Sequence, residues 1–194
     1  MRLFSGKVKK GEYGFLPYQK NRVMVFTILY FAISISIYLI GYATTGSNRN
    51  LLTIVAVLGL LPSCKSLVNL IMLFRAKACS QDVYDKIGPH EKELAGVYDL
   101  YFTTYKVNYP VSHMVLKDHV LVGYCEYSDC DVRGCEEHLK EMLKQDGHKN
   151  TVVKIFRELD RYLERLDQLS QTPREELTED EIGILTMLLS ISLS

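Results

Sequence analysis

The sequence lacks the short motifs by which most catalytic centres are recognised. It contains no glycine-rich phosphate loop and no nucleophile elbow. None of its five cysteines forms a CxxC pair, the spacing typical of structural zinc sites and redox centres. Nothing in the sequence therefore supports phosphate-loop hydrolysis or acyl transfer. We predict no catalytic residues, and an enzyme is the less favoured class of function.

Charge is also absent from one long stretch, Val23–Tyr42, which runs for twenty residues. As a helix rising 1.5 Å per residue it would extend roughly 30 Å, the thickness of the hydrocarbon core of a membrane. A soluble helix of this length would need a polar face, and this stretch offers only hydroxyl groups. It therefore predicts a transmembrane helix.

A short polar turn, residues 43–50, leads into a second apolar run, Leu51–Phe74. The turn is too short to hold a domain, so residues 23–74 predict two antiparallel helices, a transmembrane hairpin. Pro62 and Lys65 interrupt the second run. Two interpretations stay open: a spanning helix kinked at Pro62, which we favour, or two half-segments that re-enter the membrane.

Basic residues are distributed unevenly around this hairpin. The leader, residues 1–22, carries six, the turn carries Arg49 alone, and the far flank begins with Arg75 and Lys77. Since cytoplasmic flanks are enriched in Lys and Arg, we predict a multi-pass protein of the cell membrane with both termini cytoplasmic. The lipid bilayer is thus its first partner. The leader is either a basic tail that sets topology or a surface segment bound to anionic lipid.

The region after the hairpin has the opposite charge. From Arg75 onward there are 15 Lys and Arg against 22 Asp and Glu, a net of −7. An acidic surface disfavours nucleic acid as a partner, because binding the phosphate backbone needs positive charge. In the cytosol the cysteines should be reduced, so a disulfide framework is not expected.

Residues 75–171 predict a cytosolic α+β domain, and residues 172–194 predict a C-terminal amphipathic helix. Runs rich in aromatic and β-branched residues predict strands, and apolar residues at helical spacing predict helices. The predicted strands are 96–106, 109–116, 119–127 and 151–156, and the predicted helices begin near Ser80, Cys135, Arg157 and Thr178. The order after the hairpin is α-β-β-β-α-β-α-α.

That order resembles the core of restriction-endonuclease-like proteins, at the level of topology alone. Their catalytic signature combines an acidic residue with a Glu or Asp that stands two residues before a Lys on a later strand. Asp118 and Glu126 have suitable spacing, but Ser128 stands where the lysine is expected. A membrane-tethered hydrolase with a diverged nuclease-like fold is therefore one alternative function.

Cys125, Cys130, Cys135 and His138 are the candidate metal ligands in this sequence. Three thiols and an imidazole can hold Zn²⁺ in a tetrahedron. The ordinary alternative is a set of reduced thiols that pack as small apolar side chains. We expect no cofactor, with zinc as the less favoured alternative.

Lys65 is the most unusual single residue, since it lies within an apolar helix with Ser66 and Asn69 on its face and Ser63 beside it. An ammonium at this depth costs about 2.5–3.5 kcal/mol on insertion scales. Local water, a homo-oligomer or membrane partner, or an ion path could each offset that cost. The last corresponds to a second alternative, an oligomeric two-span pore or transport accessory. The favoured function is membrane-anchored interaction, scaffolding or sensing.

Overall fold

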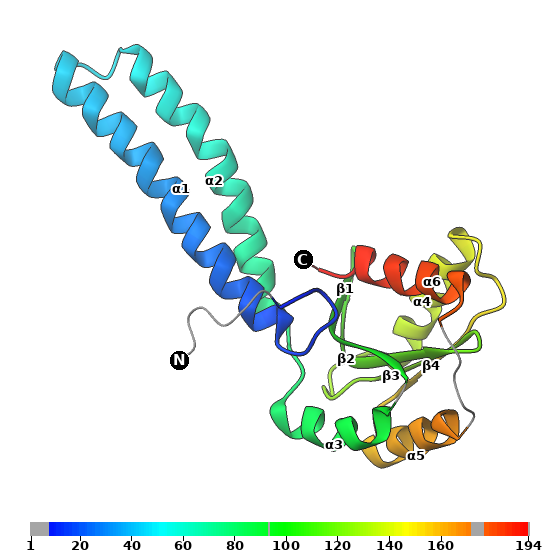
Figure 1. Ribbon diagram of the computed structural model, residues 1–194. Helices are drawn as coiled ribbons and strands as arrows, with labels where there is room; N and C mark the ends of the chain where they lie inside the picture. The colour runs from blue at the N-terminus through cyan, green and yellow to red at the C-terminus, as the bar shows by residue number, and fades with distance from the viewer. Residues whose placement is uncertain (1–7, 93, 172–176, 194) are drawn as a thin grey trace. The chain divides into compact units, whose positions relative to one another are not determined.

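The computed structural model describes residues 8–92, 94–171 and 177–193 (Figure 1). Contacts within the chain divide the described residues into two compact units. The first comprises residues 17–76, and the second comprises residues 8–16 together with 77–193. The second unit is therefore assembled from two separate parts of the sequence. We call the first the hairpin unit and the second the α+β domain.

The hairpin unit consists of two long helices, α1 (Phe15–Thr45) and α2 (Leu51–Arg75). Thr27 Oγ1 lies 2.7 Å from Ser66 Oγ, and Asn50 Nδ2 donates to the Gly41 carbonyl at 2.9 Å, so the helices run antiparallel as predicted. Both helices are long and apolar enough to cross a membrane. Helix α2 passes through Pro62 without a break, so residues 51–75 form one continuous helix rather than two half-segments.

Helix α1 begins eight residues before the predicted start, which is a correction to the expected leader. Glycines and Pro17 suggest that residues 1–22 are not helical. Pro17 instead occupies the first turn of α1, where the backbone N–H groups have no partner within the helix. Its missing donor therefore costs little, and the helix continues through Arg22 into the apolar stretch.

The α+β domain is built on a four-stranded mixed sheet in the order β1-β2-β3-β4. The strands are β1 (Ala95–Thr103), β2 (Asn108–Lys117), β3 (Val120–Tyr124) and β4 (Val152–Phe156). The helices are α3 (Gln81–Glu91), α4 (Val132–Gln145), α5 (Leu159–Ser170) and α6 (Glu179–Ile191). The element order agrees with the prediction. Neighbouring strands are antiparallel except β3 and β4, which are parallel because α4 connects them.

Helices cover both faces of the sheet, so the domain has three layers (Figure 1). On one face α3 and α5 pack through Ile87, Tyr162 and Leu166. On the other, α4 and α6 pack through apolar side chains that include Leu139 and Leu188. Strand β2 is buried along nearly its whole length, because it is central and covered on both faces.

The free edge of β1 is covered by segments from two distant parts of the chain. The backbone N–H of Tyr98 donates to the Gly11 carbonyl at 2.7 Å. Farther along the strand, the N–H of Leu193 donates to the Tyr101 carbonyl at 2.9 Å. Residues 8–14 thus belong to the domain fold, an arrangement that neither interpretation of the leader anticipates. Covering an edge strand in this way blocks edge-to-edge association.

Local signals account for most helix ends. Ser80 caps α3 at its predicted start, and Thr178 and Glu181 form a capping box at the predicted start of α6. A second match to the capping-box pattern in the sequence, residues 172–175, lies outside the described residues. Helix α3 continues through Gly88 and Pro89, where the sequence suggests an interruption. Helix α6 packs on the domain, as expected for a helix too short to span a membrane.

Candidate ligand-binding site

A pocket of about 310 Å³ opens in the α+β domain where residues 11–13, helix α3 and strand β1 meet. Each of these segments contributes side chains or bare backbone to its wall. The lining residues are Gly11, Glu12, Tyr13, Tyr84, Gly88, Glu91, Gly96 and Tyr98. Tyr84, Gly88 and Glu91 lie four and three residues apart, so they form one face of α3.

Three tyrosine rings form the aromatic part of this wall. The Tyr13 and Tyr84 rings stack with their centroids 4.1 Å apart. Tyr98 meets both rings edge-on, at 6.1 Å from Tyr13 and 5.2 Å from Tyr84. These are the favoured geometries for aromatic pairs, and they hold residues 11–13 against α3 and β1.

Glu91 supplies a carboxylate to the pocket and is oriented by Tyr98. The Tyr98 hydroxyl donates to Glu91 Oε2 at 2.6 Å, a short charge-assisted hydrogen bond. Burial raises the pKa of Glu91, but its interactions with His113 and Tyr98 outweigh that effect and place the pKa below its ordinary value. The carboxylate is therefore ionised at neutral pH, and its side chain keeps 22 % of its surface exposed.

His113 lies directly behind Glu91 and is fully buried. Tyr162, also fully buried, lies with its hydroxyl 2.8 Å from His113 Nδ1. Burial lowers the pKa of His113, so the ring is neutral at pH 7. We assign the Tyr162 O–H as donor to Nδ1, which leaves the ring proton on Nε2, facing Glu91 Oε1 at 3.8 Å. That distance exceeds a hydrogen bond, and Nε2 has no hydrogen-bond partner among the described residues.

Gly96 makes room for this arrangement. A Cβ atom at this position would collide with both the Glu91 carboxylate and the His113 imidazole. A side chain on Gly96 would therefore displace the two groups that line up behind the pocket. Bare backbone at this point of β1 is a requirement of the site rather than of the sheet.

Asp99, the residue after Tyr98, fastens the surrounding segments together. Its Oδ2 accepts from the backbone N–H of Gly14 at 2.9 Å and of Leu16 at 3.4 Å, and its Oδ1 accepts from the N–H of Cys79 at 2.8 Å. The carboxylate is buried, and burial raises its pKa despite these donors. One side chain thus holds the residues that lead into α1 and those that follow α2.

The predicted polar face of α2 is divided in the structure. Ser63 is buried, and Ser66 bonds to Thr27 of α1 at 2.7 Å, while Asn69 is half-buried. Lys65 is exposed on the surface of the hairpin unit, and no partner for its ammonium is found within the described residues. The division weighs against a continuous polar path along one exposed face.

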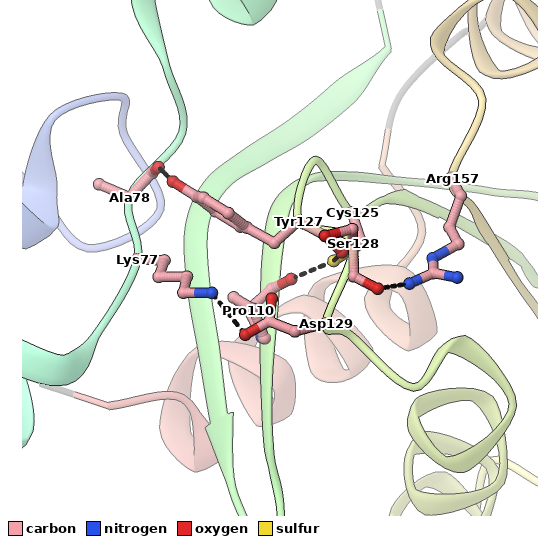
Figure 2. Close-up of polar contacts among 8 residues, drawn as sticks. All are labelled: Lys77, Ala78, Pro110, Cys125, Tyr127, Ser128, Asp129 and Arg157. Atoms are coloured by element: carbon pink, nitrogen blue, oxygen red, sulfur yellow. Dashed lines mark hydrogen bonds and ion pairs between the residues drawn. The ribbon is translucent and has the colours of Figure 1, made fainter.

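The structure gathers the three candidate metal-binding cysteines, Cys125, Cys130 and Cys135, into one buried core cluster. Cys125 Sγ donates to the Pro110 carbonyl at 2.7 Å (Figure 2). A hydrogen bond from Cys130 lowers the pKa of Cys125 and raises that of Cys130. The fourth candidate, His138, stacks on Tyr109. In the described ranges, no three His, Cys, Asp or Glu side chains converge as a metal site would require.

The loop that follows β3 is tied to the segment that follows α2 (Figure 2). Lys77 Nζ pairs with Asp129 Oδ2 at 2.6 Å, and the Tyr127 hydroxyl donates to the Ala78 carbonyl at 2.5 Å. Arg157 donates to the Ser128 carbonyl from the end of β4. These contacts stabilise the loop around the cysteines and hold residues 77–79 on the domain.

The carboxylates that a nuclease-like site would need do not come together. Asp118 lies in the turn between β2 and β3, and Glu126 follows the opposite end of β3. The five residues of β3, at about 3.3 Å each, lie between them, so the two carboxylates stand at opposite ends of the strand. Asp118 also adopts a positive φ suited to the turn, and Glu126 Oε2 accepts from the Ser80 N–H. The hydrolase alternative therefore lacks the pair of residues on which it was based.

Comparison with known protein families, with curated proteins and with solved structures finds no match to this chain.

Proposed function

We propose that the protein is a membrane-anchored sensing domain, in which the hairpin unit crosses the cell membrane twice and the cytosolic α+β domain binds a small ligand. The pocket carries this proposal. Its wall includes residues 11–13, which end two residues before α1 begins, and α3, which begins six residues after α2 ends. A ligand bound in the pocket would therefore affect both segments through which the domain is joined to the hairpin unit.

Exposed apolar surface supports the membrane anchor. The most apolar windows of α1 and α2 have mean hydropathies of 2.4 and 2.0, yet only 17 % and 11 % of them are buried. A core helix of a soluble protein would be mostly buried, and an apolar surface of this extent in water favours aggregation. The basic residues before α1 and after α2 support cytoplasmic placement of both termini.

Cysteine labelling tests the anchor directly, because Cys64 is exposed on α2 whereas Cys79, Cys125, Cys130 and Cys135 are buried. In intact membrane vesicles we expect Cys64 to resist a charged, membrane-impermeant maleimide, since the reagent does not enter hydrocarbon. Labelling should follow after denaturation. Rapid labelling in sealed and in opened vesicles alike would contradict a transmembrane α2.

Orientation is tested with two variants that each introduce one exposed cysteine in a Cys64→Ala background, where the remaining native cysteines are buried. Ser47→Cys lies in the exposed turn between α1 and α2, and Tyr105→Cys lies in the exposed loop between β1 and β2. With intact cells, the reagent should label Ser47→Cys alone. Labelling of Tyr105→Cys should require permeabilisation, and the reverse result would invert the proposed topology.

Ligand binding is tested with a variant that fills the pocket. Gly88 lines the pocket on a helix, and a Cβ there meets nothing within 4 Å, so we expect the backbone to accept Gly88→Leu and the added side chain to occupy pocket space. The melting temperature of the full chain in mild detergent is measured with glucose, acetate, adenosine monophosphate and choline. A rise in the wild type that Gly88→Leu loses supports the proposal, and no rise with any of the four contradicts it.

We also propose that copies of the chain associate through the face of α2 that carries Lys65, because that ammonium is exposed in an otherwise apolar surface. Cys64 is adjacent and exposed, so mild oxidation in membranes should cross-link two copies. Lys65→Leu removes the cost of exposing the charge to lipid, and we expect it to reduce the cross-linked fraction several-fold. Cys64→Ser is the control, and a wild-type protein that stays monomeric would refute the association.

A further inference from the structure

The charge of the pocket wall restricts what can bind there. Among the described residues that line it, Glu12 and Glu91 are acidic and none is lysine, arginine or histidine. Glu91 is ionised and partly exposed, and its Oε2 is already bonded to the Tyr98 hydroxyl. An anionic ligand would meet two carboxylates without a compensating positive charge. The electrostatics therefore favour a cation.

The aromatic part of the wall further restricts the class of ligand. The faces of the Tyr13, Tyr84 and Tyr98 rings carry negative potential, and an ammonium group within about 6 Å of such a ring is attracted to it. A strongly hydrated metal ion would gain little from these rings. An organic ammonium gains from the carboxylate through its charge and from the rings through its carbon substituents.

The size and rigidity of the pocket fit a small ligand. Its volume of about 310 Å³ lies at the lower end of the range for small-molecule sites. Glu91 is held before binding by the hydrogen bond from the Tyr98 hydroxyl, and the buried His113 lies behind it. Preorganisation of this kind reduces the entropy lost on binding.

We propose that this pocket binds a small organic ammonium ion, primary or methylated, with its charge against Glu91 and its carbon groups against the rings of Tyr13, Tyr84 and Tyr98. This inference rests on the proposed function, since it names the class of ligand that the sensing pocket takes. His113 is a positioning residue that stands behind Glu91.

The test compares choline with 3,3-dimethylbutan-1-ol, a neutral molecule of the same shape in which carbon replaces the charged nitrogen. Binding to the full chain in non-ionic detergent is measured by calorimetry and by tyrosine fluorescence, which no tryptophan obscures. We expect choline to bind at least tenfold more tightly than its neutral counterpart, and butylamine to compete with it.

Variants distinguish the contribution of the Glu91 charge to binding from the contribution of the pocket volume. Glu91→Gln keeps the shape and an acceptor for the Tyr98 hydroxyl, and we expect it to weaken choline binding at least tenfold while leaving the neutral molecule unaffected. Glu141→Gln, an exposed position on α4 across the sheet, removes the same charge and should bind choline as the wild type does. Gly88→Leu should abolish binding of both molecules.

The outcomes separate this inference from the proposed function. Equal affinity for choline and the neutral molecule, with both lost in Gly88→Leu, would overturn the ammonium ligand but retain a binding pocket. Choline binding that Glu91→Gln leaves intact would also overturn the assignment of the charge to Glu91. Binding of glucose, acetate or adenosine monophosphate but not of choline or butylamine would overturn the ligand class alone.

Discussion

Asp99→Ala is expected to lower the free energy of unfolding of the α+β domain by about 3–5 kcal/mol. The substitution removes the acceptor for three backbone N–H groups, those of Gly14, Leu16 and Cys79. Because the site is buried, water cannot replace the carboxylate freely. The loss is measured by urea denaturation of the full chain in mild detergent, followed by circular dichroism.

Asp99→Asn shows how much of the stability lost in Asp99→Ala comes from the hydrogen bonds and how much from the backbone conformation. Asp99 has a φ of 57°, in the left-handed region that Asn tolerates better than Ala. Asn keeps one acceptor oxygen and should therefore lose less than half of what Ala loses. If Asp99→Ala stays within about 1 kcal/mol of the wild type, the carboxylate does not hold these segments as described.

The second large effect is a loss of stability on acidification through His113. Burial places its folded-state pKa below the ordinary value of 6.5, because the imidazolium would lose its hydration. Between these two pKa values the unfolded chain binds more protons than the folded chain, so stability falls as pH decreases below about 6.5. The slope contributed by this residue is at most about 1.4 kcal/mol per pH unit.

His113→Asn provides the matched control for this titration. The Asn amide oxygen can accept from the Tyr162 hydroxyl much as Nδ1 does, but Asn does not titrate. The free energy of unfolding is measured for both chains from pH 7.5 to 5.5, and the wild type should lose about 1 kcal/mol more than the variant over that range. Glu91 and Asp99 are present in both chains, so the difference between the two pH profiles of the free energy of unfolding reports the titration of His113. Parallel pH profiles would refute the assignment of a neutral, buried His113.

The architecture could be predicted from the sequence where a local pattern decides the structure. Long apolar stretches indicate α1 and α2, β-branched and aromatic runs indicate the strands, and capping residues such as Ser80 and Thr178 mark helix starts. The start of α1 was missed because Pro17 is read as a helix breaker, whereas its position in the first turn makes it harmless.

The pocket could not be predicted in the same way, because tertiary structure brings its parts together. Residues 11–14 contact β1 at Tyr98 and Asp99, and these contacts join positions more than eighty residues apart. One local signal was present, since Tyr84, Gly88 and Glu91 share a face of α3. In the sequence, nothing marks Gly96 as more than an ordinary strand residue, although the space beside it admits the Glu91 and His113 side chains.

The contacts of Asp99 also set an order of events during biosynthesis. Gly14 bonds to a carboxylate that lies 85 residues later in the chain. At a typical rate of about 5–20 residues per second, residues 8–14 wait roughly 4–17 s for β1 to be synthesised. The whole of residues 17–76 is made during that interval. Closure of the domain is therefore a late step, which follows synthesis of the hairpin unit rather than preceding it.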